Sequence, residues 1–355
     1  MFEELLEGWD GKEVVLRHDA ATATWMFVCV HDTTLGPAMG GTRMKVYPTP
    51  HDALADGLRL AAAMTVKQAA ADLPYGGGKA VLAVPAVHPV GSPERREILT
   101  RYAALVDSMH GTYVTAADMN TGQADMDVVG EVTQHVLGRS PERGGSGDPA
   151  VGTAIGVFHA IRATCRRAFG TDDLAGRTIA IQGVGAVGGR LADHLHEAGT
   201  SLIVADAAAD RAHEVAQRTG ASVVDEDEVI ATVCDLFAPC ATGGVLNTAT
   251  IPALRCAAIA GAANNQLATP QDGDRLAEAG LLYAPDFVAN SGGVIWLAGY
   301  ETLGWDDAAM QARLAGIGEL LGGVFDAAEH DGITTAAAAD RLAAERLAAG
   351  STIGF

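Results

Sequence analysis

Apolar runs of two different spacings fill the first part of the chain. Residues 13–17 and 25–30 are short runs rich in apolar and β-branched residues, which predict strands joined by a hairpin-like connection. Apolar residues and alanine recur every three or four positions between Pro50 and Leu73, and this spacing predicts a helix. Glycine and proline pairs over 31–43 predict a loop or a strand end. The other elements predicted here are a strand over 79–85, a helix over 93–109, a strand over 113–116 and a helix over 124–138.

The second part of the chain alternates short apolar runs with helical patterns. Strands are predicted over 178–182 and 201–206, and further short apolar runs follow before a helical C-terminal region. Short buried strands separated by helices are typical of a parallel, doubly wound sheet. A loop rich in glycine, proline and serine, 139–150, separates the two parts.

The sequence therefore predicts an α/β protein of two domains with a cleft between them. The first, 1–148, is a mixed-sheet catalytic and oligomerisation domain, to which the C-terminal helices, about 323–355, return. The second, 149–322, is a doubly wound Rossmann domain.

Composition and charge exclude several classes of function. The chain has 355 residues, 48% of them hydrophobic, so two domains can each bury a core. A formal net charge of −20 argues against nucleic acid and anionic membranes as partners. No apolar run approaches the roughly 20 residues of a membrane span, and Met1–Lys12 lacks the apolar core of a signal peptide. Five cysteines without a CxxC pair are typical of a reducing compartment, so we expect a cytoplasmic protein.

A glycine-rich stretch carries candidate chemistry in the first domain. Gly76–Gly78 directly precede Lys79, and glycines allow a sharp turn and the close approach of another molecule. A lysine amine near apolar walls loses hydration, and its pKa then falls toward the range that suits proton transfer. The alternative is a surface turn with a solvated lysine. Lys67 and Asp118 also have ordinary alternatives, a solvated lysine at a helix end and a helix cap.

A dinucleotide-binding fingerprint follows the first strand of the second domain. Its spacing, G-x-G-x-x-G, allows a tight turn, close approach to a pyrophosphate and close packing of helix on strand. Asp206 ends the next strand, where an acid binds ribose hydroxyls and repels a 2′-phosphate, so NAD is favoured over NADP. The alternative is a glycine-rich turn in another kind of α/β sheet. The cofactor-binding candidates are Gly183, Gly185, Ala186, Val187, Gly188 and Asp206.

Two later strands end in small or amide residues that belong with this fingerprint. Ligands of open α/β sheets bind beyond the carboxyl ends of strands, so Ala238 and Cys240 are further cofactor-binding candidates. Asn264 either hydrogen-bonds a nicotinamide amide or is a turn residue. Cys240 is not expected to be a nucleophile, because no histidine lies near it in sequence.

Seven motifs, in order, resemble those of one enzyme family. They are LGPAMGGTR, MTVKQAAADLPYGGGKA, TAADMNTGQADMD, GVGAVGG, FAPCATGG, GAANNQLA and YAPDFVANSGGV. Together they resemble the Glu/Leu/Phe/Val dehydrogenases, the NAD-dependent amino-acid dehydrogenases, from about Gly36 to Arg346, and most closely the short leucine, valine and phenylalanine branch. The segments WDGKEVVLRHD and RSPERGG resemble phenylalanine dehydrogenase, whereas AAAADRLAAERLA resembles valine and leucine dehydrogenases.

The resemblance implies a reversible oxidative deamination in which an L-amino acid, NAD and water give a 2-oxo acid, ammonium and NADH. It implies that Lys79 is the general base on the attacking water and that Asp118 exchanges protons with the substrate nitrogen. The chemistry suits these residue types, because an iminium needs a water activated by a base of lowered pKa. A second lysine nearby would lower that pKa further.

The resemblance also implies the binding residues. Lys67 would hold the substrate carboxylate beside the Gly40–Gly41 backbone, and Asn290 would touch the bound amino acid. Thr153 and Asn264 would orient the nicotinamide.

Substrate choice is implied to rest on apolar residues, which argues against glutamate: Met39, Met64, Ala116, Val294 and Leu297. Ala116 and Val294 resemble the leucine and valine enzymes, whereas overall similarity points to phenylalanine dehydrogenase. Met39 should shorten the pocket, although methionine is flexible. We therefore expect an apolar amino acid, aliphatic ahead of aromatic, with phenylalanine or tryptophan as the alternative. Trp296 either lines this pocket or packs within its helix.

Two other functions are alternatives. A non-catalytic NAD-binding regulatory protein is disfavoured by the presence of both Lys79 and Asp118. A hydroxy-acid dehydrogenase usually needs a histidine base paired with a carboxylate, and none of the 11 histidines lies in a motif-like loop. The resemblance implies a homo-oligomer of two or eight subunits that meet through N-terminal strands. The expected partners are the amino acid, the 2-oxo acid and ammonium, with no nucleic acid, membrane or metal.

Overall fold

The computed structural model describes residues 2–350, which form two compact units. The described part of the first unit comprises 2–148, 297–304 and 343–350; the second comprises 149–296 and 305–342. This differs from the expected return of all helices from about 323 to the first domain. Only the last part of the final helix returns, where the Arg346 guanidinium donates to the carbonyl oxygens of Ala69 and Ala70.

The first unit is built, over its described residues, on a mixed five-stranded sheet in the order β1-β2-β4-β3-β5. β1 is antiparallel to β2, and β2 to β4, whereas β3 runs parallel to both β4 and β5. This confirms the predicted mixed sheet. The strands are β1 (Glu13–Asp19), β2 (Thr24–Val30), β3 (Ala38–Lys45), β4 (Gly76–Ala83) and β5 (Tyr113–Ala117).

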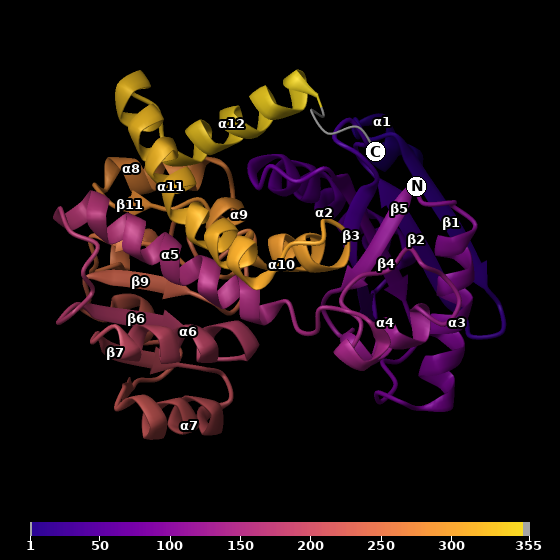
Figure 1. Ribbon diagram of the computed structural model, residues 1–355, viewed down its shortest axis with the longest axis horizontal. Coiled ribbons are helices and arrows are strands. Elements are labelled where there is room, and N and C mark those ends of the chain that lie inside the picture. Colours follow the sequence, from indigo (N-terminus) through magenta and orange to yellow (C-terminus); the bar gives the residue numbers. More distant parts are fainter. Residues whose placement is uncertain (1, 351–355) are drawn as a thin grey trace. The chain divides into compact units, whose positions relative to one another are not determined.

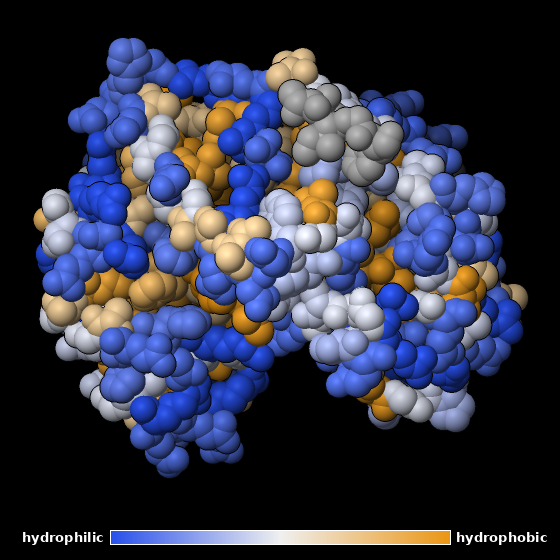
Figure 2. All heavy atoms as spheres, in the orientation of Figure 1, coloured by the Kyte–Doolittle hydropathy of each residue, from blue (hydrophilic) through white to orange (hydrophobic). Residues whose placement is uncertain are grey.

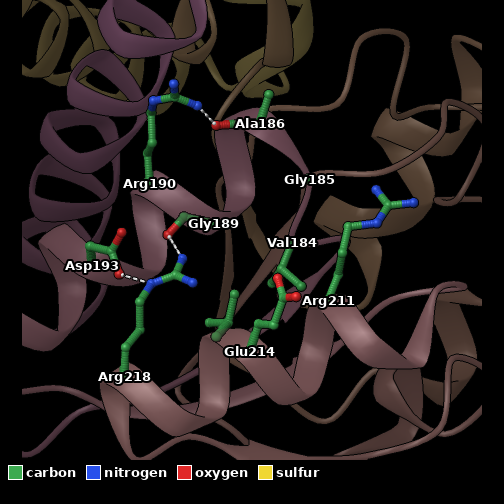
Figure 3. A pocket seen from close by; sticks show the side chains of 10 residues that line it. Val184, Gly185, Ala186, Gly189, Arg190, Asp193, Arg211, Glu214 and Arg218 are labelled. Atoms are coloured by element: carbon green, nitrogen blue, oxygen red, sulfur yellow. Dashed lines mark hydrogen bonds and ion pairs between the residues drawn. The ribbon is translucent and has the colours of Figure 1, made fainter.

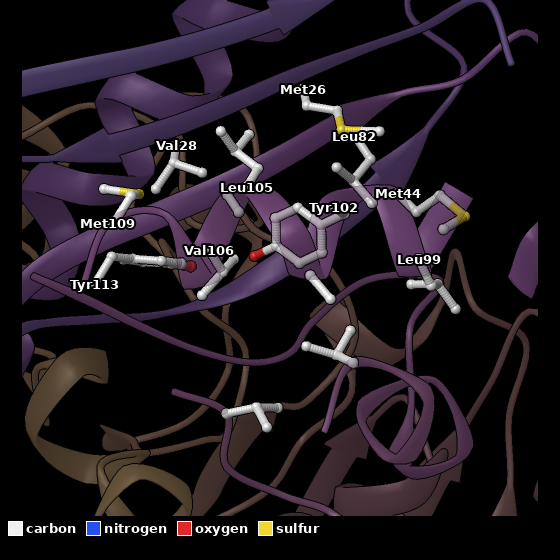
Figure 4. Close-up of a cluster of buried hydrophobic side chains, with 14 of the residues drawn as sticks. Met26, Val28, Met44, Leu82, Leu99, Tyr102, Leu105, Val106, Met109 and Tyr113 are labelled. Carbon is white, nitrogen blue, oxygen red and sulfur yellow. The ribbon is translucent and has the colours of Figure 1, made fainter. Parts of the chain in front are cut away.

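Helices cover both faces of this sheet. Helix α2 (Pro50–Ala70) packs with Phe27, Cys29 and Val81 on one face. Helix α3 (Pro93–Asp107) packs with the other face in a larger core that holds Tyr102 and Tyr113 (Figure 4). Because successive strand side chains point to opposite faces, Lys79 lies on the α2 face, as Val81 does two positions later. Two short helices complete the unit: α1 (Phe2–Glu7) and α4 (Gln123–Val129).

The glycine run is strand rather than turn. Gly76–Gly78 begin β4, and none of them has a positive φ. A Cβ on Gly77 would lie 2.0 Å from Thr65 Oγ1, and one on Gly78 would lie 2.9 Å from the ring of Tyr113. The chain's own atoms therefore occupy the space beside these glycines, so their absent side chains serve packing within the unit.

Two further sequence predictions differ from the structure in this unit. The segment 31–43, predicted as a loop or a strand end, contains most of β3, which is buried between β4 and β5. The helix predicted over 124–138 ends at Val129, and Val136 instead forms a bridge with Thr115. Strand β3 was missed because Gly40 and Gly41 lower its strand propensity, and its stability comes from two neighbouring strands.

The second unit contains, in its described part, a six-stranded parallel sheet in the order β11-β10-β9-β6-β7-β8. This confirms the predicted doubly wound fold. Strand order reverses between β6 and β9, the switch point at which such sheets bind ligands. The strands are β6 (Thr178–Gln182), β7 (Ser201–Ala205), β8 (Ser222–Val223), β9 (Leu236–Pro239), β10 (Ala258–Ile259) and β11 (Leu282–Tyr283).

Helices α5 (Ala150–Phe169) and α6 (Ala186–Glu197) pack side by side on this sheet (Figure 1). A core around Phe237, Ile259 and Tyr283 fills the other side. The remaining helices are α7 (Ala209–Thr219), α8 (Gln271–Glu278), α9 (Asp286–Ala289), α10 (Gly292–Glu301), α11 (Asp307–Asp331) and α12 (Thr335–Ala349). No helix of the described chain is long and apolar enough to cross a membrane.

Candidate active site

Lys79 and Asp118 form an ion pair on the α2 face of the first sheet. Lys79 lies in β4 and Asp118 directly follows β5, and the lysine Nζ is 2.9 Å from Asp118 Oδ1. The lysine side chain is only 5% exposed and that of the aspartate 20%. The solvated-lysine interpretation of Lys79 is therefore wrong.

Burial and neighbouring charges together set the direction of the pKa shift of each group. Burial lowers the pKa of Lys79, and the Arg43 guanidinium also lowers it, while the Asp118 carboxylate raises it. Burial raises the pKa of Asp118, but the charges of Lys79 and Arg43 outweigh this and hold it well below its usual range. The pair thus combines a firmly ionised carboxylate with an amine that loses its proton more readily than a solvated lysine.

Arg43 is the site residue that sequence reasoning missed. Its Nε donates to Asp118 Oδ2 at 2.9 Å, and its Nη1 donates to Asp56 Oδ2 at the same distance. Asp56 also accepts a 2.7 Å hydrogen bond from the Tyr47 hydroxyl. The sequence did offer a signal, because Arg43 is a single charge in the otherwise uncharged stretch AMGGTRM. A charged strand residue that is nearly buried needs a partner of opposite charge.

Gly41 makes the Lys79–Asp118 contact possible. In the sheet register Gly41 is paired with Ala116, and Lys79 continues the same row on β4. A Cβ on Gly41 would lie 2.8 Å from the Cβ of Asp118 and 2.5 Å from the carbonyl oxygen of Ala117. The missing side chain therefore leaves room for Asp118 to reach back across β3 to the lysine.

The loop after β5 holds Asp118 through a buried arginine. Arg95 Nε and Nη2 donate to the two oxygens of Asp125 at 2.6 and 2.7 Å, and Nη2 also donates to the carbonyl oxygen of Asn120. Asp125 in turn accepts from the backbone N–H of Gly122, the N-cap of α4. Asp118 does not cap this helix, so the helix-cap interpretation is wrong. Arg95 and Asp125 instead fix the turn that presents Asp118.

We expect Arg95→Met to destabilise the protein by about 3–5 kcal/mol, because it leaves the buried Asp125 carboxylate without its counter-charge. Turnover should fall as well, because the loop that carries Asp118 loosens. Urea denaturation and steady-state kinetics would measure both effects. The matched control is Arg96→Met, which removes an exposed pair with Glu131 and should cost at most about 1 kcal/mol. Equal losses in the two variants would contradict the role of Arg95.

Helix α2 carries the other substrate-binding candidates of this region. Lys67 and Met64 lie three positions apart near its end, so they share a face, and both are partly exposed. Gly40 lies in β3, where its carbonyl oxygen accepts a 2.6 Å hydrogen bond from the Tyr113 hydroxyl. Lys67 and Gly40 thus belong to the same unit as Lys79.

The apolar pocket candidates are divided between the units. Met39 is buried in β3 on the face of Gly41, and Ala116 is buried in β5. Leu297 also belongs to the first unit, where its Cδ2 lies beside Gly138, whereas Val294 belongs to the second. Trp296 packs against Gly152 of α5: a Cβ at Gly152 would lie 2.6 Å from the Trp296 Cβ, which favours the packing interpretation.

The glycine-rich turn of the second unit fits a dinucleotide. Gly183 has a φ of +89°, which favours glycine, and a Cβ on Gly188 would lie 2.0 Å from the Gly183 carbonyl oxygen. Gly185 is the N-cap of α6, and a Cβ there would meet no atom closer than 3.5 Å. The first and third glycines are thus required by the protein's own packing. The second leaves the start of α6, with Ala186 and Val187, open to a phosphate.

Asp206 is tied to this turn by backbone hydrogen bonds. Its Oδ2 accepts from the N–H of Val184 at 2.9 Å, and its Oδ1 accepts from the N–H of Ala208 at 2.8 Å. Arg211 Nε lies 3.7 Å from Oδ1, a cation that sequence reasoning missed although it lies in the helix that follows. The acid therefore holds the turn.

A pocket of about 300 Å³ lies beside the turn, between α6 and α7 (Figure 3). Arg218 bridges the two helices here, because it donates to Asp193 Oδ1 at 2.6 Å and to the carbonyl oxygen of Gly189 at 3.0 Å. Hydrophilic side chains gather over α7, at the lower left of Figure 2. The lining residues are Val184, Gly185, Ala186, Gly189, Arg190, Asp193, Arg211, Glu214, Val215 and Arg218.

We expect Gly188→Ala to weaken NADH binding about tenfold or more and to lower the melting temperature, because the added methyl overlaps the Gly183 carbonyl. Fluorescence titration with NADH and thermal unfolding would measure these effects. Gly316→Ala in α11 is the control: no atom lies within 4 Å of the new methyl, so this change should stabilise the protein by about 0.5–1 kcal/mol. Unchanged NADH affinity in Gly188→Ala would rule out this turn as the binding site.

The amide candidates lie together in the second unit. Asn290 Nδ2 donates to Asn264 Oδ1 at 3.0 Å and to the carbonyl oxygen of Ala262 at 3.1 Å. The Thr153 hydroxyl donates to the carbonyl oxygen of Pro149 at 3.0 Å within the first turn of α5. Asn290 Oδ1 is buried and has no hydrogen-bond partner in the described structure.

The two strand-end candidates differ in exposure, since Ala238 is buried and Cys240 is half-buried. Ala238 is fully buried and pairs with Ile181 inside the sheet. Cys240 N–H donates to the carbonyl oxygen of Gln182 at 2.7 Å, and burial raises the pKa of its thiol to about 12. A high pKa disfavours the thiolate, in agreement with the expectation that Cys240 is not a nucleophile.

Comparisons with known proteins match nearly the whole chain. Residues 14–135 match the family model for the Glu/Leu/Phe/Val dehydrogenase dimerisation domain, and residues 144–209 and 205–352 match that for glutamate/leucine/phenylalanine/valine dehydrogenase. A leucine dehydrogenase of Geobacillus stearothermophilus is 42% identical over 96% of this chain and 92% of its own. A valine dehydrogenase of Streptomyces albus is 43% identical over 95% and 92%. The crystal structure of an L-tryptophan dehydrogenase from Nostoc punctiforme has a TM-score of 0.80 at 37% identity, over 98% of this chain and 99% of that one.

Proposed function

The chain belongs to the Glu/Leu/Phe/Val dehydrogenase family, and on that premise we propose that it catalyses the NAD-dependent, reversible oxidative deamination of an apolar L-amino acid. Because its relatives are leucine and valine dehydrogenases, the chain is an oxidoreductase that acts on amino acids. The observation that carries the finer proposal is the buried ion pair of Lys79 and Asp118, whose titration is suited to proton transfer.

Each proton transfer of the proposed reaction is assigned to a residue of this chain. Lys67 and the Gly40–Gly41 backbone hold the substrate carboxylate. Asp118 accepts a proton from the substrate ammonium, so that the nitrogen lone pair assists departure of the hydride from Cα. Lys79, in its neutral form, takes a proton from the water that attacks the iminium carbon. Asp118 then protonates the nitrogen, and ammonia leaves as the C–N bond breaks and the hydroxyl proton is released.

The two groups support each other through their coupling. An ionised Lys79 lowers the pKa of Asp118, so a neutral Lys79 raises it and makes the aspartic acid easier to protonate. Arg43 contacts the other carboxylate oxygen and holds the side chain in place through the cycle.

NAD supplies the hydride acceptor when it is bound, and the glycine turn of Gly183 to Gly188 would hold its pyrophosphate at the start of α6. Asp206 supports a preference for NAD, since a carboxylate repels a 2′-phosphate. Arg211 offsets part of that repulsion. We expect kcat/KM to be at least about tenfold higher with NAD than with NADP, a difference of about 1.4 kcal/mol. Steady-state kinetics with both cofactors would test this, and a preference for NADP would overturn it.

The proposed substrate is aliphatic, with an aromatic amino acid as the second candidate. Met39 and Ala116 support the first, because both are buried and apolar on the face of Lys79. The structural likeness to a tryptophan dehydrogenase favours the second. NADH formation at alkaline pH should give a higher kcat/KM for leucine and valine than for phenylalanine and tryptophan. A preference for glutamate would contradict the apolar pocket, and no turnover with any apolar L-amino acid would contradict the proposed function.

We also propose a homo-oligomer. β1 is the outer strand of the described first sheet, and its Leu16 is 41% exposed, so both a backbone edge and apolar surface are available to a second copy. Light scattering should give a mass of two or more chains, and Leu16→Lys should shift the population to smaller species. A monomeric wild-type protein would contradict the proposal. The cytoplasmic location stays a prediction, which cell fractionation would test.

A further inference from the structure

Cys234 and Cys256 are direct neighbours on two adjacent segments of the second unit, just before β9 and β10. The register of β9 and β10 continues to a bridge between Val233 and Arg255, which brings the next residues, the two cysteines, opposite each other. The N–H of Cys234 donates to the carbonyl oxygen of Arg255 at 3.2 Å. Neighbouring strands lie about 4.7–4.9 Å apart, which is inside the Cα separation of about 4.4–6.8 Å found in disulfides. Both cysteines are free and partly exposed.

The two thiols interact directly. A hydrogen bond between the side chains is the largest influence on each: it raises the pKa of Cys234 and lowers that of Cys256. Burial opposes the lowering at Cys256, but backbone hydrogen bonds with Phe237 and Ala258 strengthen it. Of the two thiols, that of Cys256 therefore loses its proton more readily, and the thiolate is the reactive form of cysteine.

The other three cysteines lack this arrangement. Burial raises the pKa of Cys29 and Cys240 to about 12 and that of Cys165 to about 11. The pair that precedes β9 and β10 is thus distinguished from the other three cysteines by its thiol neighbour.

The cysteine pair lies away from the cofactor residues. Cys234 and Cys256 precede β9 and β10, whereas the turn of Gly183 follows a strand end and Asp206 directly follows β7. Parallel strands place their starts at one edge of the sheet and their ends at the opposite edge. A reaction at the cysteines therefore leaves the dinucleotide turn unchanged.

We propose that Cys234 and Cys256 form an oxidisable dithiol that reacts with small-molecule disulfides and closes to an intramolecular disulfide. The Cys256 thiolate attacks one sulfur of the reagent, the reagent S–S bond breaks, and one thiolate leaves and takes up a proton. Cys234 then loses its proton and attacks the Cys256 sulfur, which releases the second reagent thiol. Two protein thiols are oxidised to one disulfide while the reagent is reduced to two thiols.

The test treats the folded wild-type protein with oxidised glutathione at neutral pH, blocks the remaining thiols and measures intact and peptide masses. The expected result is the loss of two thiols, no retained glutathione, and a linked pair of peptides containing Cys234 and Cys256. Cys234→Ser should retain one glutathione on Cys256. Cys256→Ser should react at least about tenfold more slowly, because its remaining thiol has a raised pKa. Cys165→Ala is the control and should behave like the wild type.

Three results would overturn the proposal. They are a stable glutathione adduct on the wild-type protein, loss of two thiols in Cys234→Ser, and equal reaction of Cys165 with the pair. Alkylation of the wild-type protein is a test that needs no substitution, so it does not depend on whether a variant folds. Cys256 should be alkylated by iodoacetamide at least about tenfold faster than Cys165, and equal rates would also overturn the proposal. NADH affinity should be the same before and after oxidation.

Discussion

Lys79→Met should lower kcat/KM for the amino acid by about 10²–10⁴-fold, the usual contribution of a general base. Methionine matches the lysine stem in size and removes only the amine, which is almost fully buried. Asp118 keeps its hydrogen bond from Arg43, so the carboxylate is not left without a counter-charge. Stability should therefore change little, and NADH affinity should be that of the wild type because the proposed turn lies in the other unit.

The pH dependence separates loss of a base from loss of structure. Lys79 acts as a base only when it is neutral, so activity should fall as the pH drops through its lowered pKa. Wild-type kcat/KM should thus rise with pH and level off before the usual lysine pKa of about 10.4. Lys79→Met should lose this pH-dependent rise. Lys45→Met, at an exposed residue of β3, is the control and should retain the wild-type profile. Turnover within about tenfold of the wild type in Lys79→Met would exclude the general-base role.

Asp118→Asn should lower kcat by about 10²–10⁴-fold and also shift the pH profile. The carboxylate raises the pKa of Lys79, so an amide that removes the negative charge lets that pKa fall further. The residual activity should therefore have its acid limb at lower pH than the wild type. An unshifted limb would show that the lysine does not titrate against Asp118.

The same substitution should alter stability as a function of pH. The folded pKa of Asp118 is lowered, so its contribution is present above the unfolded value of about 3.9 and is lost as the pH falls toward the folded value. Urea denaturation should show Asp118→Asn less stable than the wild type at neutral pH, with the two converging in acid. Asp107→Asn, at an exposed position ending α3, is the control and should match the wild type throughout.

The spacing of nearby residues was sufficient to predict the dinucleotide turn. Gly183, Gly185 and Gly188 lie within one strand-turn-helix unit, and the sequence predicted a separate role for each of them. The structure agrees for the first and third: Gly183 has a positive φ, and a Cβ on Gly188 would lie 2.0 Å from the Gly183 carbonyl oxygen. Short-range geometry of this kind can be inferred from residue order because few chain conformations satisfy it.

Strand β3 shows where local information fails. Its glycines weaken the strand pattern, and it becomes a strand because β4 and β5 pair with both of its edges. The glycines that begin β4 were likewise expected to turn, but Thr65 and Tyr113 fill the space where side chains would be. Both outcomes depend on segments that are distant in sequence, which residue propensity does not describe.

The sequence by itself determined the α/β class, the doubly wound second half and the family, and it singled out Lys79 and Asp118 as the proposed reactive residues. Tertiary structure alone decided how those two residues titrate. It buried the lysine, brought Asp118 to it across Gly41, and added Arg43, which the sequence had placed in a loop or a strand end. The physical reason is that a pKa depends on burial and on charges within a few ångströms, and those are set by strand pairing between residues up to 75 positions apart.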